Sequence, residues 1–573
     1  MKSQESAAIR VALLGSFTLE LLARYVAREF RNQQIDVDLY FGGYSQYQQD
    51  LLDPNSPYYR YNPAYTLLLV DGLDVFPAFY FEPSPLAERD KTALVQERLS
   101  EFRQLAELCC ARLPKNQLLI GQAVFPGRTI LGPLDWNSAD SVQEHFAEFN
   151  AGLARISRDL PNAHILDLRG AALEMGYARW RDSRLWYLAR CRLSHAAMEE
   201  VAHLLVASVG ALRGKRRKCL VLDLDNTLWG GIAGNDALEE LHLGPEGMGL
   251  AFYEFQRLIR QLKAQGILLA VNSKNNFADA MEIIESHPCM LLRREDFAAI
   301  RINWSDKTTN MREISGELGL GMDSFAYFDD SPFERNLMRS QLPEVLTVEV
   351  PTDPTQYVET VLNLDAFWTF ALTDDDRTRH RKYQLRAQRE SMQKSARSIE
   401  EFYSSLQMKA LIRPGSEALA SRVSQLTQRT NQFNLTTKRY EPGQIRQLLA
   451  DGSYRLWVLE LSDRFGSEGS VGVAVVFERD GDWGIDTFLL SCRVIGRTVE
   501  QAFLAYISAE AKRSGARRLV GRYLPTPRNS CVAELYPSLG FHPAAQPNEW
   551  AFDLNSQELA SPPWIEVTSR TSE

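Results

Sequence analysis

Three short apolar runs in the middle of the chain each end in polar or charged residues. The runs and the residues that follow them are Cys219–Leu222 with Asp223 and Asp225, 267–271 with Asn272, Ser273 and Lys274, and Phe325–Phe328 with Asp329 and Asp330. Apolar runs of this length, separated by amphipathic helical patterns, are typical of buried strands in a parallel sheet. Ligands of such sheets gather at the carboxyl ends of the strands. The pattern therefore predicts an open α/β sheet with a charged edge in residues 213–370.

The residue types at this edge suit the transfer of a phosphoryl group. Asp223 can attack phosphorus, and Asp225 can donate a proton to the leaving group and then activate water. Ser273 and Lys307 can neutralise charge on the transferring group. Carboxylates also bind Mg²⁺, which prefers oxygen ligands, and the predicted metal ligands are Asp223, Asp225 (through its backbone oxygen), Asp329 and Asp330. The predicted substrate-binding residues at the same edge are Thr227, Asn272 and Lys274.

These segments resemble the four motifs of the haloacid dehalogenase superfamily, and more narrowly its subfamily IIIC, the FkbH-like proteins of polyketide pathways. The resemblance is carried by Asp223-Leu-Asp-Asn-Thr-Leu-Trp-Gly-Gly231, Val271-Asn-Ser-Lys-Asn275, Asn303-Trp304 with Lys307, and Phe328-Asp-Asp-Ser-Pro-Phe-Glu-Arg335. It implies a dehalogenase-like Rossmannoid core. The intervals between these motifs are too short for the lid domain that many phosphatases of the superfamily insert, so we expect an open site that suits a large substrate.

Residues 1–212 alternate apolar runs with helical patterns, and strands are expected at 9–14, 65–70, 117–124 and 164–168. This predicts a second parallel sheet. The unit resembles an SGNH-hydrolase-like α/β domain that lacks a Gly-Asp-Ser start. Ser16 follows the first run, where it could be a nucleophile or the N-cap of a helix, and we favour the cap. A catalytic triad would also need an acid and a histidine, and the candidates Asp182, Ser194 and His195 are weak.

Residues 401–560 again alternate strands and helices, with strands expected at 456–461, 471–477 and 486–490. The last strand leads into Arg493-Val-Ile-Gly496 and then a helical pattern. This arrangement resembles the acyl-CoA-binding segment of GCN5-type acetyltransferases, so a GNAT-like domain is expected. Backbone amides of such a loop and the helix N-terminus can bind phosphate. The predicted substrate contacts are Arg493, Gly496 and Arg497.

Cys492 lies at the start of this loop. A thiolate is a good acyl acceptor, and we favour that role over the alternative of a buried structural cysteine. The other six cysteines are expected to be packing residues. Thr498 stands where the acetyltransferases have a small residue, which favours the single phosphate of phosphopantetheine on a carrier protein over free CoA.

Three further segments join or end these units. The basic run 213–218 is typical of a solvated linker. Residues 371–400 are predicted to form a helical connector, and its basic stretch 377–389 could dock an acidic carrier protein. Residues 561–573 are expected to be a tail.

Composition excludes several classes of protein. The 573 residues carry a net charge of −9, which disfavours a nucleic-acid binder. No run reaches the about 18 apolar residues of a membrane span, so no membrane partner is expected. The 7 cysteines include no C-x-x-C pair, which favours a reduced, cytoplasmic protein.

The FkbH-like resemblance implies a glyceryl transferase. Such an enzyme takes D-glycerate from 1,3-bisphosphoglycerate, releases phosphate and loads the glyceryl unit on the phosphopantetheine of an acyl carrier protein as a thioester, for a polyketide extender or starter unit. Three alternatives stay open. They are a Mg²⁺-dependent phosphatase that leaves Cys492 idle, a GNAT acetyltransferase on a degenerate phosphatase scaffold, and a docking scaffold without activity.

Overall fold

The computed structural model describes residues 8–83, 88–372, 392, 398–430, 432–526, 529–544 and 546–569. The chain forms two compact units, residues 1–377 and 378–573. The first unit contains two five-stranded sheets and the second contains one eight-stranded sheet. This is the multidomain α/β class that the sequence predicts. The basic stretch 377–389 lies outside the described residues.

The N-terminal sheet is entirely parallel and has the order β2-β1-β3-β4-β5. Its strands are β1 Ile9–Gly15, β2 Val37–Phe41, β3 Tyr65–Leu69, β4 Gln117–Gly121 and β5 Ala163–Leu166. Four of the five strands were predicted. The fifth, β2, is an edge strand whose residues are half-buried or exposed, so it lacks the apolar run by which a buried strand is identified.

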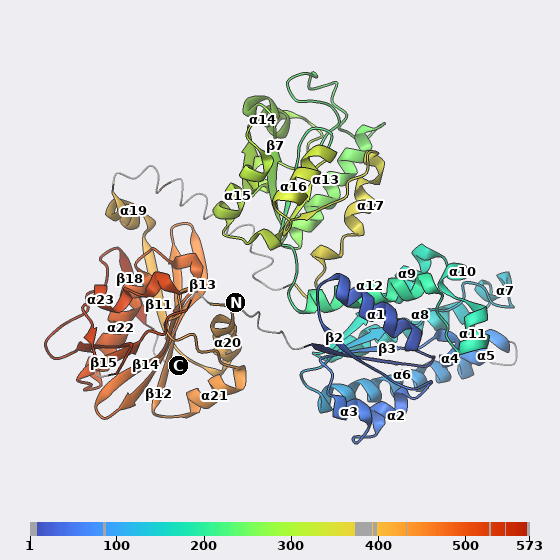
Figure 1. Ribbon diagram of the computed structural model, residues 1–573, viewed down its shortest axis with the longest axis horizontal. Coiled ribbons are helices and arrows are strands. Elements are labelled where there is room, and N and C mark those ends of the chain that lie inside the picture. The colour runs from blue at the N-terminus through green and yellow to red at the C-terminus, as the bar shows by residue number, and fades with distance from the viewer. Residues whose placement is uncertain are drawn as a thin grey trace. The chain divides into compact units, whose positions relative to one another are not determined.

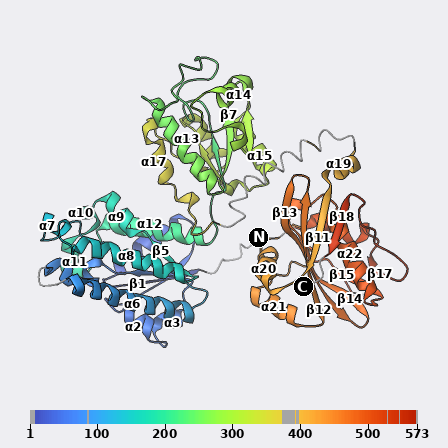
Figure 2. The same ribbon diagram turned by 180° about the vertical axis from the view of Figure 1, so that it is seen from behind.

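Helices cover both faces of this sheet (Figures 1 and 2). Because side chains alternate along a strand, Val11 and Leu13 pack with α1 and α12 on one face, and Ala12 and Leu14 pack with α6 and α8 on the other. The helices are α1 Glu20–Asn32, α2 Tyr47–Leu52, α3 Pro57–Tyr61, α4 Gly72–Val75, α5 Pro77–Phe81, α6 Glu88–Arg112, α7 Pro133–Trp136, α8 Val142–Asp159, α9 Leu168–Met175, α10 Tyr177–Trp180, α11 Ser183–Ala189 and α12 His195–Leu212.

The predicted helix cap at Ser16 is wrong. Helix α1 begins four residues later at Glu20, and its N-cap makes no side-chain hydrogen bond. The buried Ser16 hydroxyl instead donates to Asp74 Oδ2 (2.7 Å) and accepts from the Asp71 amide (3.1 Å). Both carboxylates form ion pairs with the guanidinium of Arg192. A buried charged cluster therefore occupies the place where a nucleophile was considered.

The three weak triad candidates have other roles. Asp182 and Ser194 cap the N-termini of α11 and α12. His195 Nδ1 lies 2.8 Å from the hydroxyl of Tyr25. Each candidate thus has a structural partner elsewhere, and none of these contacts leads to Ser16.

The second sheet of unit 1 is also parallel, with the order β10-β9-β6-β7-β8. Its strands are β6 Cys219–Leu222, β7 Leu268–Ser273, β8 Ala299–Ile302, β9 Phe325–Phe328 and β10 Leu346–Thr347. Its helices are α13 Gly249–Ala264, α14 Phe277–Ser286, α15 Lys307–Leu318, α16 Pro332–Gln341 and α17 Tyr357–Leu362, with short 3₁₀ turns at Arg294–Asp296, Met322–Ser324, Pro354–Gln356 and Asp365–Phe367. Figure 1 places β7 between α15 on one side and α13 on the other.

No lid domain interrupts this sheet. Only α13 and the irregular segment before it separate β6 from β7, and only α14 and a 3₁₀ turn separate β7 from β8. The fold is the expected dehalogenase-like core without a large cap. The carboxyl ends of β6, β7 and β9 lie side by side because β6 is flanked by β9 and β7.

The basic run 213–218 is not simply a solvated linker. The Arg216 guanidinium donates to Phe367 O (2.9 Å), and Arg217 Nη1 donates to Glu344 O (3.0 Å). The backbone amide of Lys218 donates to Ser324 O (2.7 Å). Guanidinium groups here satisfy backbone carbonyls at the amino-terminal edge of the sheet, so the run is attached to this domain.

The C-terminal unit has a mixed sheet with the order β16-β17-β15-β14-β13-β12-β11-β18. The strands are β11 Met408–Pro414, β12 Tyr454–Asp463, β13 Gly466–Arg479, β14 Asp482–Leu490, β15 Arg518–Arg522, β16 His542–Pro543, β17 Glu549–Asp553 and β18 Ile565–Ser569. The helices are α19 Ile399–Leu406, α20 Ala420–Arg429, α21 Pro442–Ala450, α22 Val499–Arg513 and α23 Leu535–Ser538, with 3₁₀ turns at Glu417–Leu419, Cys492–Val494 and Ser530–Val532.

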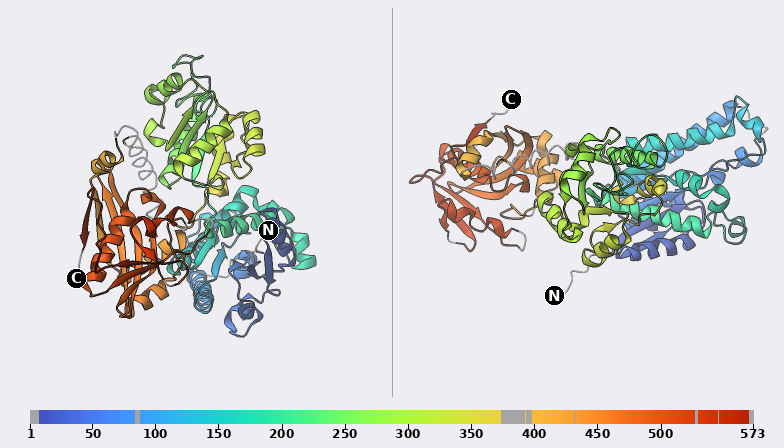
Figure 3. Two further views of the ribbon diagram at one scale, coloured as in Figure 1. Left: turned by 60° about the vertical axis from the view of Figure 1, so that its left-hand side comes forward. Right: turned by 90° about the horizontal axis from the view of Figure 1, so that it is seen from above.

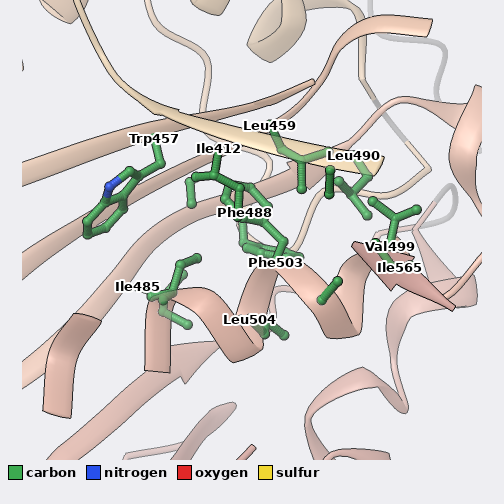
Figure 4. Close-up of a cluster of buried hydrophobic side chains, with 14 of the residues drawn as sticks. Ile412, Trp457, Leu459, Ile485, Phe488, Leu490, Val499, Phe503, Leu504 and Ile565 are labelled. Carbon is green, nitrogen blue, oxygen red and sulfur yellow. The ribbon is translucent and has the colours of Figure 1, made fainter. Parts of the chain in front are cut away.

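Helix α22 covers one face of this sheet, and α20 and α21 cover the other (Figure 3). Figure 4 shows the first contact, in which Phe503 of α22 reaches Phe488 and Leu490 of β14. Strand β18 pairs in parallel with β11. Its five residues lie within the segment 561–573 that was expected to be a tail, so this part of the prediction is wrong.

Among the described residues, each helix is too short or too polar to span a lipid bilayer.

Candidate active site

Lys307 lies at the centre of the charged edge. It is the first residue of α15, whose N-cap is Asp306, and only 3% of its surface is exposed. Its Nζ atom lies 2.9 Å from Asp223 Oδ2 and 2.6 Å from Asp329 Oδ2. Burial alone would lower the pKa of Lys307, but these two carboxylates outweigh burial and raise the pKa above its usual value. The side chain is therefore a fixed cation that joins the ends of β6 and β9.

Asp329 is fully buried and held by donors on both oxygens. Oδ1 accepts from the Ser331 amide (2.9 Å), and Oδ2 accepts from Lys307 and from the Tyr327 hydroxyl. Burial and the charge of Asp223 raise the pKa of Asp329. Burial, followed by the charges of Asp223 and Asp329, raises the pKa of Asp330 to about 6. Such shifts mark a site where several negative charges are held close together.

Three of these carboxylates form a possible cation site. Asp223, Asp329 and Asp330 each offer an oxygen, and these oxygens lie within 4.8 Å of one another. Asp223 Oδ1 is buried and has no hydrogen-bond partner within the described part of the chain. A buried carboxylate oxygen without a donor is costly, and hard divalent cations take oxygen ligands. The donor set therefore fits a divalent cation.

Asp225 lies apart from this acidic group. Its Oδ1 accepts from Trp229 Nε1 (2.9 Å) and from the Ala233 amide (3.0 Å), and its Oδ2 accepts from Asn275 Nδ2 (2.8 Å). Burial raises the pKa of Asp225, which suits a residue that must both hold and release a proton. The side chain of Asp225 is not part of the acidic cluster that fits a cation.

Two predicted substrate-binding residues have partners inside the protein. Asn272 is fully buried, donates to the backbone oxygen of Lys307 (2.8 Å) and accepts from Asn310 (3.1 Å). It therefore positions Lys307 from β7. Lys274 Nζ bonds Glu334 Oε1 (2.7 Å), which connects the loop after β7 to α16.

Thr227, the third substrate-binding residue predicted at this edge, and Ser273, predicted to neutralise charge on the phosphoryl group, are both buried. Ser273 is the last residue of β7 and is buried, and its backbone oxygen accepts from the Asn303 amide (3.1 Å). The Thr227 hydroxyl is buried and has no hydrogen-bond partner within the described part of the chain. Ser273 thus lies at the carboxyl end of β7, and Thr227 lies in the turn that follows β6.

Sequence reasoning did not identify Tyr327, Trp229 or Asn275 as site residues. Trp229 and Asn275 lie inside the recognised motif segments and Tyr327 directly precedes one of them, so their positions were in view. Their roles depend on which way each side chain points, because Tyr327 shares the strand face of Asp329 at spacing two while Trp229 and Asn275 reach Asp225 from irregular segments. Only the alternation in β9 could have signalled one of them.

The predicted loop of the C-terminal unit is bound within its own domain. Arg497 is mostly buried and forms ion pairs with Asp463 (3.4 Å) and Glu468 (3.7 Å). Arg493 Nε donates to Ser491 Oγ (3.1 Å). Gly496 has a φ of +78°, which favours glycine, and its carbonyl accepts from the hydroxyl of Tyr403 (2.6 Å).

The side chain of Cys492 lies outside the described residues, so its proposed role rests on the sequence. One of the cysteines expected to be packing residues is exposed instead. This is Cys531, whose thiol lies 3.4 Å from the backbone oxygen of Gln432.

Strands β14 and β15 pair only near their starts, Trp483 and Gly484 with Leu519 and Val520. Beyond that point the chain's own segment 433–435 lies against β14. The Leu490 amide donates to Phe433 O (3.0 Å), and the Leu435 amide donates to Phe488 O (3.2 Å). These backbone groups of β14 are therefore already paired and are not available to a ligand that enters between the strands.

The chain matches known proteins in its first unit most clearly. A family model described as the FkbH N-terminal domain matches residues 10–209. The crystal structure of the N-terminal part of BF1531 from Bacteroides fragilis, which contains a phosphatase domain complexed with Mg, is 33% identical, with a TM-score of 0.59. The match covers 64% of this chain and 95% of that one. No curated protein matches the chain.

Two further solved structures match single parts. The lipase Lip_vut3 from a goat rumen metagenome is 12% identical over 35% of this chain and 97% of its own, with a TM-score of 0.28. The ribosomal-protein-S18-alanine N-acetyltransferase from Escherichia coli is 13% identical over 25% of this chain and 94% of its own, with a TM-score of 0.21. The family match, the BF1531 relative and the motif residues now placed at one sheet edge agree, and the chain belongs to the FkbH-like family.

Proposed function

We propose that this protein is a Mg²⁺-dependent phosphatase-type enzyme that acts on an acyl phosphate and transfers the acyl group to a carrier protein. The proposed donor is 1,3-bisphosphoglycerate and the proposed product is a glyceryl thioester on the phosphopantetheine of an acyl carrier protein. The observation that carries the proposal is the Lys307 ammonium held between Asp223 and Asp329 (2.9 and 2.6 Å). A site that only binds an anion would not place a lysine between two carboxylates. A phosphoryl-transfer site needs both the positive charge of the lysine and the negative charges of the carboxylates.

The chemistry of the donors supports magnesium as the cation. The BF1531 relative is complexed with Mg, and here Asp223, Asp329 and Asp330 would hold the ion. A bound Mg²⁺ polarises phosphoryl oxygens and neutralises their charge. Without it, the four aspartates and one lysine of the site carry an excess of negative charge, which would repel a phosphate.

The residues of the chain then divide the remaining work. Lys307 and Ser273 bind phosphoryl oxygens, and Lys307 is fixed for this by Asn272. Asp223 is the group proposed to approach phosphorus, and Asp225 is proposed to give or take a proton. The donor carries two phosphates, so two routes at this site together give a glyceryl thioester. In one, Asp223 attacks the phosphorus of the 3-phosphate ester, the alcohol oxygen leaves with a proton from Asp225, and water then releases the phosphate from Asp223. In the other, Asp223 only holds the phosphate of the acyl phosphate.

In the second route a thiol sulfur attacks the carbonyl carbon of the acyl phosphate. The new carbon–sulfur bond replaces the bond from carbon to the phosphate oxygen. Phosphate leaves with that electron pair, and Asp225 takes the thiol proton. We propose Cys492 as a first acceptor, from which the phosphopantetheine thiol takes the glyceryl group by thioester exchange. Arg493, Gly496 and Arg497 were expected to bind the phosphopantetheine, and the internal ion pairs of Arg497 make its role there structural.

The test combines the protein, Mg²⁺, 1,3-bisphosphoglycerate and a phosphopantetheinylated carrier protein. Intact-protein mass spectrometry is expected to find a carrier that has gained one glyceryl unit, and no gain with Asp223→Asn. A carrier that stays unmodified while phosphate is released would show that the enzyme is a phosphatase without transfer. Separately, a glyceryl adduct that persists on the Cys492→Ala enzyme would overturn the role of Cys492.

A stand-alone phosphatase is the second candidate, because one domain of unit 1 contains every residue that the reaction at phosphorus needs. That candidate predicts phosphate release at the same rate with and without carrier. An acetyltransferase on a degenerate scaffold is disfavoured, since the proposed site retains its carboxylates and lysine in mutual contact. Acetyl transfer from acetyl-CoA that tolerates Asp223→Asn would support it.

A further inference from the structure

Four large apolar side chains are exposed on the loops or first helical turns that follow strands β6, β7, β8 and β9 of the dehalogenase-like domain. They are Ile232 after β6, Phe277 after β7, Trp304 after β8 and Phe333 after β9, with 46%, 50%, 71% and 69% of their surfaces exposed. We call these four residues the apolar rim. In a parallel sheet these loops lie at the same edge as the site, so the rim and the charged residues share one edge.

Contacts between the loops make the rim continuous. Trp304 Nε1 donates to Asn276 Oδ1 (3.0 Å), so the loop after β8 is fixed to the loop after β7 beside Phe277. A side chain at Gly234 would come within 2.6 Å of Asp279 Oδ2, which shows that the segment around Ile232 lies against the start of α14.

The fourth rim residue, Phe333, is connected to the loop after β7 through α16. The ion pair between Lys274 and Glu334 joins the loop after β7 to α16 next to Phe333 (2.7 Å).

Trp304 is exposed and is also held by its hydrogen bond to the loop after β7. A large apolar side chain that is held in place loses little freedom on binding, which is typical of the anchors of protein interfaces.

The rim is larger than a small phosphorylated substrate requires. At about 200 Å² for each aromatic side chain, the exposed parts of its three aromatic residues amount to roughly 400 Å². Apolar patches of about 300–600 Å² on a monomer are often functional, and a standard protein interface takes about 800 Å² from each partner. Half of such an interface is already present. A three-carbon acyl phosphate would fill only the polar floor formed by Asp223, Ser273 and Lys307.

We propose that the apolar rim is the docking surface for the acyl carrier protein, whose phosphopantetheine arm then enters the site between the rim residues. This inference rests on the proposed function. The rim is continuous with the phosphoryl site, and no insert of the dehalogenase-like domain covers it within the described residues 213–372. A partner that rests on the rim while its arm reaches the buried floor matches a carrier protein, because the reactive thiol of a carrier stands at the end of a long flexible arm.

The test uses the full-length protein and compares a rim variant with a matched surface variant. The rim variant is Trp304→Ala with Phe333→Ala. The control is Leu362→Ala, which removes an equally exposed apolar side chain (60%) at the end of α17 in the same domain. Binding of phosphopantetheinylated carrier is measured by fluorescence anisotropy of a labelled carrier, with Mg²⁺ present, and thermal unfolding of each protein is recorded.

The rim variant is expected to raise the Kd for the carrier at least tenfold and to raise the KM for the carrier in the loading reaction, while Leu362→Ala keeps the wild-type Kd. Hydrolysis of acetyl phosphate without carrier is expected to fall less than threefold in the rim variant. Carrier binding and loading by the rim variant at wild-type levels would overturn the docking surface and leave the proposed function intact. Absence of any loading by the wild-type protein would overturn both. Dimerisation of the wild-type protein that the rim variant abolishes would assign the rim to a second copy of the chain and would also overturn the proposal.

Discussion

Replacement of Lys307 by methionine tests the electrostatics of the site most directly. Methionine keeps most of the stem of the lysine and removes only the ammonium group. Asp223 and Asp329 then lose the cation that now lies 2.9 and 2.6 Å from them. Breaking a buried ion pair by removing one partner costs about 3–5 kcal/mol. Because two carboxylates share this ammonium and Asp330 adds a third charge nearby, we expect a loss of about 4–5 kcal/mol at pH 8 in a chelator.

Both a lower pH and bound Mg²⁺ should reduce the loss of stability in Lys307→Met. The pKa values of Asp329 and Asp330 are already raised in the folded protein, so the carboxylates accept protons readily when the lysine is absent. At pH 5 protonation removes part of the repulsion, and the loss should fall to about 2 kcal/mol. Saturating Mg²⁺ supplies the missing positive charge and should also stabilise Lys307→Met more than it stabilises the wild type.

The free energy of opening is measured by amide hydrogen exchange in peptides that cover β6 and β9, because exchange reports on each domain separately. The matched control is Lys263→Met, which removes a lysine that pairs with Asp296 in the same domain but is more exposed. We expect a loss of about 1 kcal/mol or less for this control. Equal losses for the two variants, or a loss at Lys307 that Mg²⁺ increases, would refute the reasoning.

Three further predictions each concern a single residue. Tyr327→Phe removes one donor from the buried Asp329 and should cost about 1–2 kcal/mol and change the Mg²⁺ Kd in isothermal titration; an unchanged Kd and stability would contradict a positioning role. Asp225→Asn should keep the fold, since its amide oxygen can still accept from Trp229, and should lower phosphate release by about 100-fold or more; release near the wild-type rate would contradict the acid–base role. Burial raises the pKa of Asp71 to about 6, so the folded state binds more protons than the unfolded state between about pH 4 and 6, and stability should fall by about 2–3 kcal/mol as pH rises through this window. Asp71→Asn should remove that slope from urea-unfolding curves, and an unchanged slope would exclude Asp71 as its source.

The parts of the fold that the sequence predicts are those where one physical signal dominates. Strands β6, β7 and β9 are fully buried, so each appears as an apolar run, and the polar residues after them could be assigned to one edge by the rule for parallel sheets. Strand β2 has no such run because it lies at an edge. Strand β18 pairs with β11 from more than 150 residues away, a contact that no local pattern encodes.

The roles of single residues were harder to predict than their positions. Ser16 follows a strand as a helix cap would, yet α1 begins only at Glu20, and the Ser16 hydroxyl donates to Asp74 of the short helix α4 that follows β3. Arg497 looked like an anion ligand, but Asp463 and Glu468 on the neighbouring strands use its charge. In each case the partner is distant in sequence, so composition and spacing could not identify it.

Asn272 shows how the site is held together. It was expected to bind substrate because it lies between the last apolar residue of β7 and Ser273. Its side chain instead joins the end of that strand to the first turn of α15, through Lys307 O and Asn310. The ammonium of Lys307 then reaches across to β6 and β9. One amide therefore links the backbone of the helix start to a strand, while the lysine side chain links the same residue to two further strands. The separation between Asp223 and Asp329 is fixed from the helix side, and a lysine on a mobile loop could not keep two like charges this close before substrate and cation arrive.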